Sequence, residues 1–150
     1  MNKIDLFLAV RCSYLDGFDP IDEVETLMAS KPFVWFGKYG EPLGSGVSSM
    51  LEKQERRIFV VLIEKQKATG LYKYHPYRLL EATKTQPKKR SDYPKYYKAF
   101  IDRIGQWLRL APYDGPAFEL QSLVIKSSAQ PLQRTLHNSM RGHFLCRLGP

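Results

Sequence analysis

Apolar residues recur along this chain with two different periods, which predicts a mixture of β-strands and α-helices. The run IDLFLAVRC at 4–12 is typical of a strand buried on both faces, and RIFVVLIEKQK at 57–67 is the plainest strand of the chain. Further strands are predicted at 33–40, where FVWFGKYG runs into a glycine bend, after the turn near Gly70, at 117–128 and at 143–148.

Two segments carry apolar residues at helical spacing. Asp19 is a preferred N-cap and Pro20 suits the first helical position, so we expect an amphipathic helix over 20–30. The spacing also predicts a helix over 95–110, carried by Tyr97, Phe100, Ile101, Ile104 and Leu108. The segment 45–57 fits either a loop followed by a helix or an irregular hairpin, and 129–140 fits a turn or a short helix. The polar stretch 83–94 is expected to be an exposed loop.

Composition and length indicate one soluble domain spanning 1–150. The chain is 43% hydrophobic and 25% charged, and neither a repeat nor a linker divides it. The apolar run at 4–12 is too short for a membrane span and lacks a cleavage site for export. We therefore expect a cytoplasmic protein without membrane contact, in which Cys12 and Cys146 are reduced. The element order predicts an α+β fold: a small mixed, partly open β-barrel with two flanking helices.

This element order resembles that of the PUA-like superfold. Together with FVWFGKYG (33–40), GLYKYHPYRLLEA (70–82) and the basic segment that follows, it is similar to EVE and YTH-type domains, including the DNA-specificity modules of modification-dependent restriction systems. Such domains bind DNA or RNA through a basic face and hold one extruded, often methylated, base in an aromatic cage. The resemblance implies the same role here, in a restriction or defence system. The tryptophan and glutamate-proline that open EVE domains are absent from 4–12, so the resemblance does not identify the base.

Two groups of aromatic residues are candidates for holding such a base. Stacking on one ring contributes roughly 1–3 kcal/mol per base, so a cage needs several rings. Strand alternation sends Trp35 and Phe36 to opposite faces, so one of them fills the core while the other can border a pocket. The glycines at 37 and 40 allow close approach of a ligand. The predicted base-binding residues are Trp35, Phe36, Tyr39, Tyr72 and Tyr74. The alternative is that these rings only fill a barrel.

The distribution of charge predicts where a nucleic-acid backbone would bind. Twenty-three Lys and Arg against 15 Asp and Glu give a net charge of +8, which attracts polyanions. The predicted backbone-binding residues are Lys38, Lys84, Lys88, Lys89, Arg90, Lys95 and Lys98, of which the last six are interrupted by one acid, Asp92. An ordinary solvated surface is the alternative. The predicted partner is nucleic acid, DNA rather than RNA, with other subunits of a larger complex as further partners.

The sequence predicts a binding module more than an enzyme. His137, His143 and Cys146 do not have the spacing of a zinc site, and neither a nucleophile elbow nor a carboxylate cluster of nuclease type is found. We therefore predict no catalytic residues, no metal and no cofactor. One alternative is a small hydrolase or RNA-processing enzyme on a PUA-like barrel, with Lys38, Lys73 and Tyr74 as candidates. A protein-interaction module presenting exposed Tyr and Trp is the other alternative.

Overall fold

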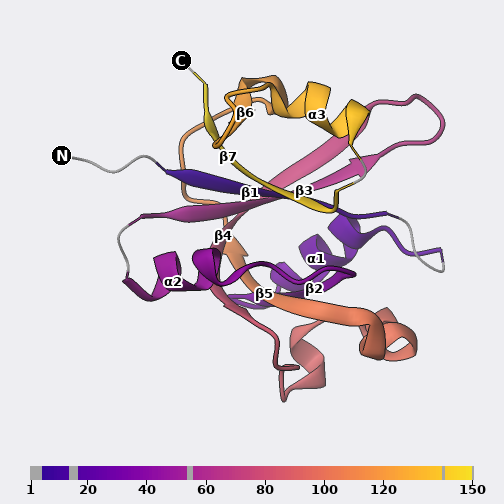
Figure 1. Cartoon of the computed structure of the whole chain (residues 1–150). Helices are drawn as coiled ribbons and strands as arrows, with labels where there is room; N and C mark the ends of the chain where they lie inside the picture. The colour runs from indigo at the N-terminus through magenta and orange to yellow at the C-terminus, as the bar shows by residue number, and fades with distance from the viewer. Residues whose placement is uncertain (1–4, 14–16, 54–55, 140, 150) are drawn as a thin grey trace.

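Seven strands form one mixed sheet in the order β2-β5-β4-β3-β1-β7-β6 (Figure 1). The computed structural model of the chain describes residues 5–13, 17–53, 56–139 and 141–149. β1 and β3 pair in parallel, whereas the other five neighbouring pairs are antiparallel. The strands are β1 (Leu6–Arg11), β2 (Val34–Tyr39), β3 (Ile58–Lys65), β4 (Tyr72–Thr83), β5 (Ile104–Pro112), β6 (Leu123–Ile125) and β7 (His143–Leu148).

Three α-helices and three 3-10 helices complete the described part of the chain. The α-helices are α1 (Pro20–Met28), α2 (Ser45–Lys53) and α3 (Leu132–Asn138), and the 3-10 helices are η1 (Arg90–Asp92), η2 (Lys95–Arg103) and η3 (Leu120–Ser122). The predicted α+β class is confirmed. The sheet ends at β2 on one side and at β6 on the other, so it is not closed, and the predicted barrel is not confirmed.

The strand predicted at 4–12 and the helix predicted after Asp19 are both present, as β1 and α1. β1 is buried on both faces, because α1 and α2 cover one face of the sheet while α3, β6 and η3 cover the other. Figure 1 shows α1 and α2 in the space between β1–β3 and β2–β5, and α3 on the far side of β7. Asp19 caps α1, since its Oδ1 accepts hydrogen bonds from the Ile21 and Asp22 amides at 3.0 and 3.4 Å. Both open alternatives are resolved as helices, namely α2 and α3.

The predicted helix over 95–110 is wrong in its second half. η2 ends at Arg103, and the chain continues directly into β5, which pairs with β2 on one side and β4 on the other. Residues four apart share a face of a strand as well as of a helix, so Ile104 and Leu108 satisfied both patterns. In the strand, Ile104, Leu108 and Leu110 are buried. The strand predicted at 117–128 is also shorter than expected, because only Leu123–Ile125 pairs as β6.

Two further observations concern membrane-spanning helices and the two cysteines. None of the helices in the described part of the chain combines the length and apolar composition that crossing a membrane needs. Cys12 and Cys146 are both free thiols.

Candidate ligand pocket at the ends of strands β1 and β2

A pocket of about 120 Å³ lies where the ends of β1 and β2 approach each other. Its walls are residues 11–13, Pro20 at the start of α1, residues 36–39 of β2, and Tyr96 and Tyr97 of η2. Three strands separate β1 from β2 in the sheet order, so the sheet must curl for both to reach one pocket. β2 ends beside the pocket at a turn in which Gly40 has φ +79°, a conformation that glycine adopts without strain.

The structure separates the five rings that were predicted to bind a base. Phe36 and Tyr39 line the pocket, although Phe36 is 3% exposed and also belongs to the core beneath α1 and α2. Trp35 faces the opposite side of β2 and packs beside the Arg109 guanidinium, 6.0 Å from its ring. Tyr72 and Tyr74 pack on the α3 face of the sheet. Tyr72 lines a different pocket of about 230 Å³, which shares residues 11–13 with the first.

Tyr96 and Tyr97 supply the aromatic wall that the sequence analysis did not assign to a base site. The Tyr96 ring stacks on Phe18 with centroids 4.9 Å apart and meets the Tyr97 ring edge-on at 4.8 Å. The Gly37 amide donates a hydrogen bond to the Tyr97 hydroxyl at 3.2 Å, which ties η2 to β2. The motif KYYK at 95–98 was the available signal, because it places two adjacent tyrosines between two lysines, and the structure turns the tyrosines inward and exposes the lysines.

Tyr39 presents a buried hydroxyl beside the pocket. Its oxygen has no hydrogen-bond partner among the described residues. Burial raises the pKa of Tyr39 to about 12, although the nearby Arg103 acts in the opposite direction. The phenol is therefore neutral at pH 7 and keeps one donor and one acceptor unused.

Lys38 lies inside the molecule, whereas the sequence analysis placed it on the backbone-binding surface. Its side chain is 3% exposed, and its ammonium donates hydrogen bonds to the carbonyl oxygens of Glu41 and, at 3.5 Å, Tyr39. Burial lowers the pKa of Lys38. Strand alternation explains why Lys38 is buried, since Lys38 follows Val34 and Phe36 on the inward face of β2.

Arg11 is also engaged internally. Its guanidinium donates hydrogen bonds to the carbonyl oxygens of Leu136, Ser139 and Arg141, which lie at the end of α3 and in the segment leading to β7. These bonds satisfy carbonyl groups that a helix end leaves without partners. Arg11 therefore holds the wall of the pocket in place and is not a free cation.

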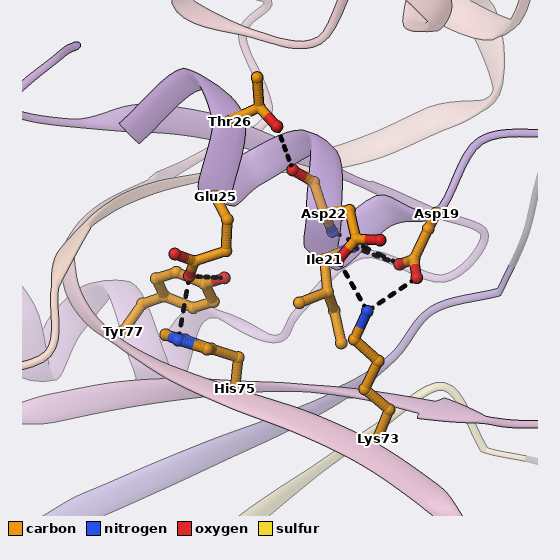
Figure 2. Close-up of polar contacts among 8 residues, drawn as sticks. All are labelled: Asp19, Ile21, Asp22, Glu25, Thr26, Lys73, His75 and Tyr77. Carbon is orange, nitrogen blue, oxygen red and sulfur yellow. Dashed lines mark hydrogen bonds and ion pairs between the residues drawn. The ribbon is translucent and has the colours of Figure 1, made fainter. Parts of the chain in front are cut away.

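Behind Cys12, the start of α1 is joined to β4 by an ion-pair network, shown in Figure 2. The Lys73 Nζ lies 2.8 Å from Asp19 Oδ2 and 2.8 Å from Asp22 Oδ1. Burial alone would lower the pKa of Lys73, but the two hydrogen-bonded carboxylates raise it, so the amine stays protonated. Burial opposes ionisation of Asp19, but the hydrogen bond and charge of Lys73, together with hydrogen bonds from Glu64 and the Asp22 amide, outweigh it and lower the pKa of Asp19.

A second part of the same interface fixes the middle of α1. The Tyr77 hydroxyl donates a hydrogen bond to Glu25 Oε1 at 2.7 Å, and His75 Nε2 lies 3.1 Å from the same oxygen (Figure 2). Burial, with help from Glu25, raises the pKa of Tyr77. These contacts position the helix and leave its first turn against the pocket.

Glu64 is the most unusual acid in this region. Its side chain is 1% exposed, and neither carboxyl oxygen accepts a hydrogen bond from a donor group among the described residues, although the Asp19 carboxyl is close enough to share a proton with it. Burial, together with the neighbouring Asp19, raises the pKa of Glu64 to about 7. Burial, Glu64 and Asp19 also raise the pKa of Cys12 far above neutrality. Cys12 is thus a protonated thiol and a poor nucleophile.

The other predicted backbone-binding residues form one exposed basic segment, residues 84–98. All six of its predicted cations are exposed, and none forms an ion pair with an acid in the described ranges: Lys84, Lys88, Lys89, Arg90, Lys95 and Lys98. The one acid in the segment, Asp92, is paired with Lys31 at 3.3 Å. Arg90, Lys95 and Lys98 surround a second pocket of about 230 Å³, floored by Tyr93 and Ile101.

The pocket lining combines aromatic rings with polar groups. It offers aromatic faces, the buried Lys38 amine, the Tyr39 phenol and the protonated Cys12 thiol. Within the described ranges, no three His, Cys, Asp or Glu side chains are grouped as metal ligands. Comparison with known proteins adds no family: no family model matches the chain, and no significant match is found among curated proteins or solved structures.

Proposed function

We propose that the protein is a nucleic-acid binding module of the PUA-like, EVE type, with one extruded and modified base in the pocket between β1 and β2. The observation that carries this proposal is the composition of η2. Its Tyr96 and Tyr97 line the pocket, while Lys95 and Lys98 of the same helix are exposed beside a second pocket. One short element thus presents rings on one side and cations on the other.

The basic segment supports the phosphate-binding part of the proposal. Its cations have no acid partners in the described residues, so their field acts outward on a polyanion. Neutralised phosphates release counterions, which makes binding depend steeply on salt. Each phosphate contact contributes about 0.9 to the slope of log K against log salt for a duplex, and about 0.7 for a single strand.

The pocket supports the base-binding part. Removing a base from its stack requires a few kcal/mol, which ring faces and hydrogen bonds to the base edge must offset. Tyr39 and Tyr96 offer ring surface, and the Tyr39 hydroxyl and the Lys38 ammonium offer polar groups. The volume of about 120 Å³ suits one flat ring and excludes a base pair.

Binding to matched oligonucleotides tests the proposal. Fluorescence anisotropy would compare DNA and RNA, single-stranded and duplex, with and without 5-methylcytosine or N6-methyladenine, at about 50 and 200 mM salt. We expect tighter binding at low salt and a preference for one modified base. If the protein binds none of the oligonucleotides at low salt, the proposal is refuted.

Two matched pairs of variants separate the two parts of the site. Tyr96→Ala should weaken binding of the preferred base by roughly 1–3 kcal/mol, whereas Tyr74→Ala, on the α3 face, should not. Lys98→Gln should lower the salt slope by about 0.7–0.9 for every oligonucleotide, whereas Arg57→Gln, whose cation is paired with Asp5 at 2.7 Å, should leave the slope unchanged. Equal effects of the two tyrosine variants would contradict the choice of pocket.

A further inference from the structure

A second cleft, larger than the first pocket, lies between α2 and β7. Its volume is about 440 Å³, within the range of small-molecule sites. Most of its lining is apolar, with Leu8 and Leu145 from the paired strands β1 and β7, and Val47 and Met50 from α2. Gly44 and Gly46 also line it, and a Cβ built on either would meet no atom within 4 Å.

The polar groups of this cleft are basic. Lys126 and Arg141 line it, His143 is the third titratable residue of the lining, and Asp and Glu are absent from the lining residues. Neither Lys126 nor Arg141 is ion-paired in the described part of the chain, and both are exposed. The Arg141 guanidinium lies 5.9 Å from the centre of the Phe144 ring, which places positive charge directly above apolar surface.

His143 adds unmet hydrogen-bonding capacity. Its Nδ1 is buried and has no partner among the described residues. Burial, and then the charges of Lys38 and Arg141, lower the pKa of His143, which leaves the ring neutral at pH 7. A buried polar atom without a partner destabilises the protein, and a ligand group that reached it would remove that penalty.

We propose that the cleft between α2 and β7 binds a small organic anion that combines an apolar body with a carboxylate. The apolar body packs against the side chains of β1, α2 and β7, and the carboxylate pairs with Arg141 and Lys126. A cationic or neutral molecule of the same shape lacks that pairing. The inference does not depend on nucleic-acid binding, because the cleft shares no lining residue with the pocket between β1 and β2.

The probe is sodium octanoate, with octylammonium chloride as a control of the same chain length and opposite charge. Methyl-region NMR of the full chain would follow both titrations. We expect octanoate to shift the methyl signals of Leu8, Val47 and Leu145 saturably, and octylammonium to bind at least tenfold more weakly. Equal shifts by both compounds, or octanoate shifts confined to other methyl groups, would overturn the proposal.

Two variants locate the site. Arg141→Gln should weaken octanoate roughly tenfold, the size expected for one charge-assisted hydrogen bond, whereas Lys67→Gln removes the same charge from an exposed residue outside the cleft lining and should leave affinity unchanged. Gly46→Leu adds a bulky side chain to a residue of the lining, where a Cβ has open space, and should also weaken octanoate. Unchanged affinity in Arg141→Gln and Gly46→Leu, with native methyl spectra, would refute the assignment.

Discussion

Replacing Glu64 by Gln should make the protein more stable above neutral pH. The carboxyl is 1% exposed and its pKa is raised by burial to about 7, from an ordinary value of 4.5. Between those two values the folded state holds a proton that the unfolded state has released, so wild-type stability falls as the pH rises. One pKa unit corresponds to about 1.36 kcal/mol, so the loss reaches at most about 3 kcal/mol above pH 7.

The Gln side chain has the shape of the protonated acid and stays neutral at every pH. It can also donate a hydrogen bond to the neighbouring Asp19 carboxylate, whose proximity helps to raise the pKa of Glu64. We therefore expect the variant to equal the wild type within about 1 kcal/mol near pH 5 and to exceed it by about 2–3 kcal/mol near pH 8. His143, whose pKa is lowered, favours the folded state as pH rises, but it acts equally on both proteins and cancels in the difference.

Urea unfolding measured from about pH 5 to 8.5 provides the assay, with stability taken at each pH from the midpoint and slope. The control is Glu52→Gln, which removes the same charge from an exposed position on α2. The difference in unfolding free energy between Glu52→Gln and the wild type should not grow by about 2–3 kcal/mol between pH 5 and 8, as it should for Glu64→Gln. A Glu64→Gln variant that is less stable than the wild type at pH 8 would show that the ionised carboxylate is stabilising, and the reasoning would fail.

Three further changes test other contacts. Gly105→Ala should destabilise the protein by roughly 1–3 kcal/mol in thermal unfolding, because the added Cβ would lie 2.6 Å from the Gly40 carbonyl oxygen; a loss below about 0.5 kcal/mol would mean that the backbone shifts freely. Lys73→Met should cost roughly 1–2 kcal/mol at pH 7 in urea, and the loss should disappear as the pH falls below the lowered pKa of Asp19; a loss that persists in acid would indicate packing instead of charge. Tyr39→Phe should leave stability unchanged or raise it by up to about 1 kcal/mol, since it removes a buried hydroxyl without a partner; a large loss of melting temperature would reveal a bond to that hydroxyl.

The elements that could be predicted are those whose signals are local. Asp19 and Pro20 predict the start of α1. The continuous apolar run of β1 predicts a strand covered on both faces, which the structure shows. The junction between η2 and β5 could not be predicted, because Ile104 and Leu108 fit a helix and a strand equally well. Only pairing with β2 and β4, which depends on distant residues, decides for the strand.

The candidate site could be predicted only in part, for a similar reason. Alternation states that Trp35 and Phe36 face opposite ways but not which face borders a pocket, and the structure places Phe36 there. Lys38 looked like a surface cation because lysine is mostly exposed, whereas the inward row of β2 buries it. Glu64 lies near the polar end of the predicted strand 57–67, and its burial beside Asp19 depends on contacts between segments distant in sequence, which no local pattern encodes.

The pocket between β1 and β2 and the cleft between α2 and β7 both lie where the open sheet brings β2 close to β7. β2 and β7 do not pair, yet the Lys38 ammonium lies 3.5 Å from the place of a Cβ on Gly142, just before β7. At this seam between β2 and β7, side-chain cations take the place of strand pairing. The Lys38 ammonium donates a hydrogen bond to the Glu41 carbonyl oxygen in the β2–α2 loop, and the Arg11 guanidinium donates one to the Ser139 carbonyl oxygen after α3. Two spaces lie next to this seam, namely the pocket beside Tyr39 and the cleft beside His143. Part of the basic charge of this chain therefore closes the fold internally, whereas the cations of residues 84–98 are exposed and form no ion pair in the described ranges.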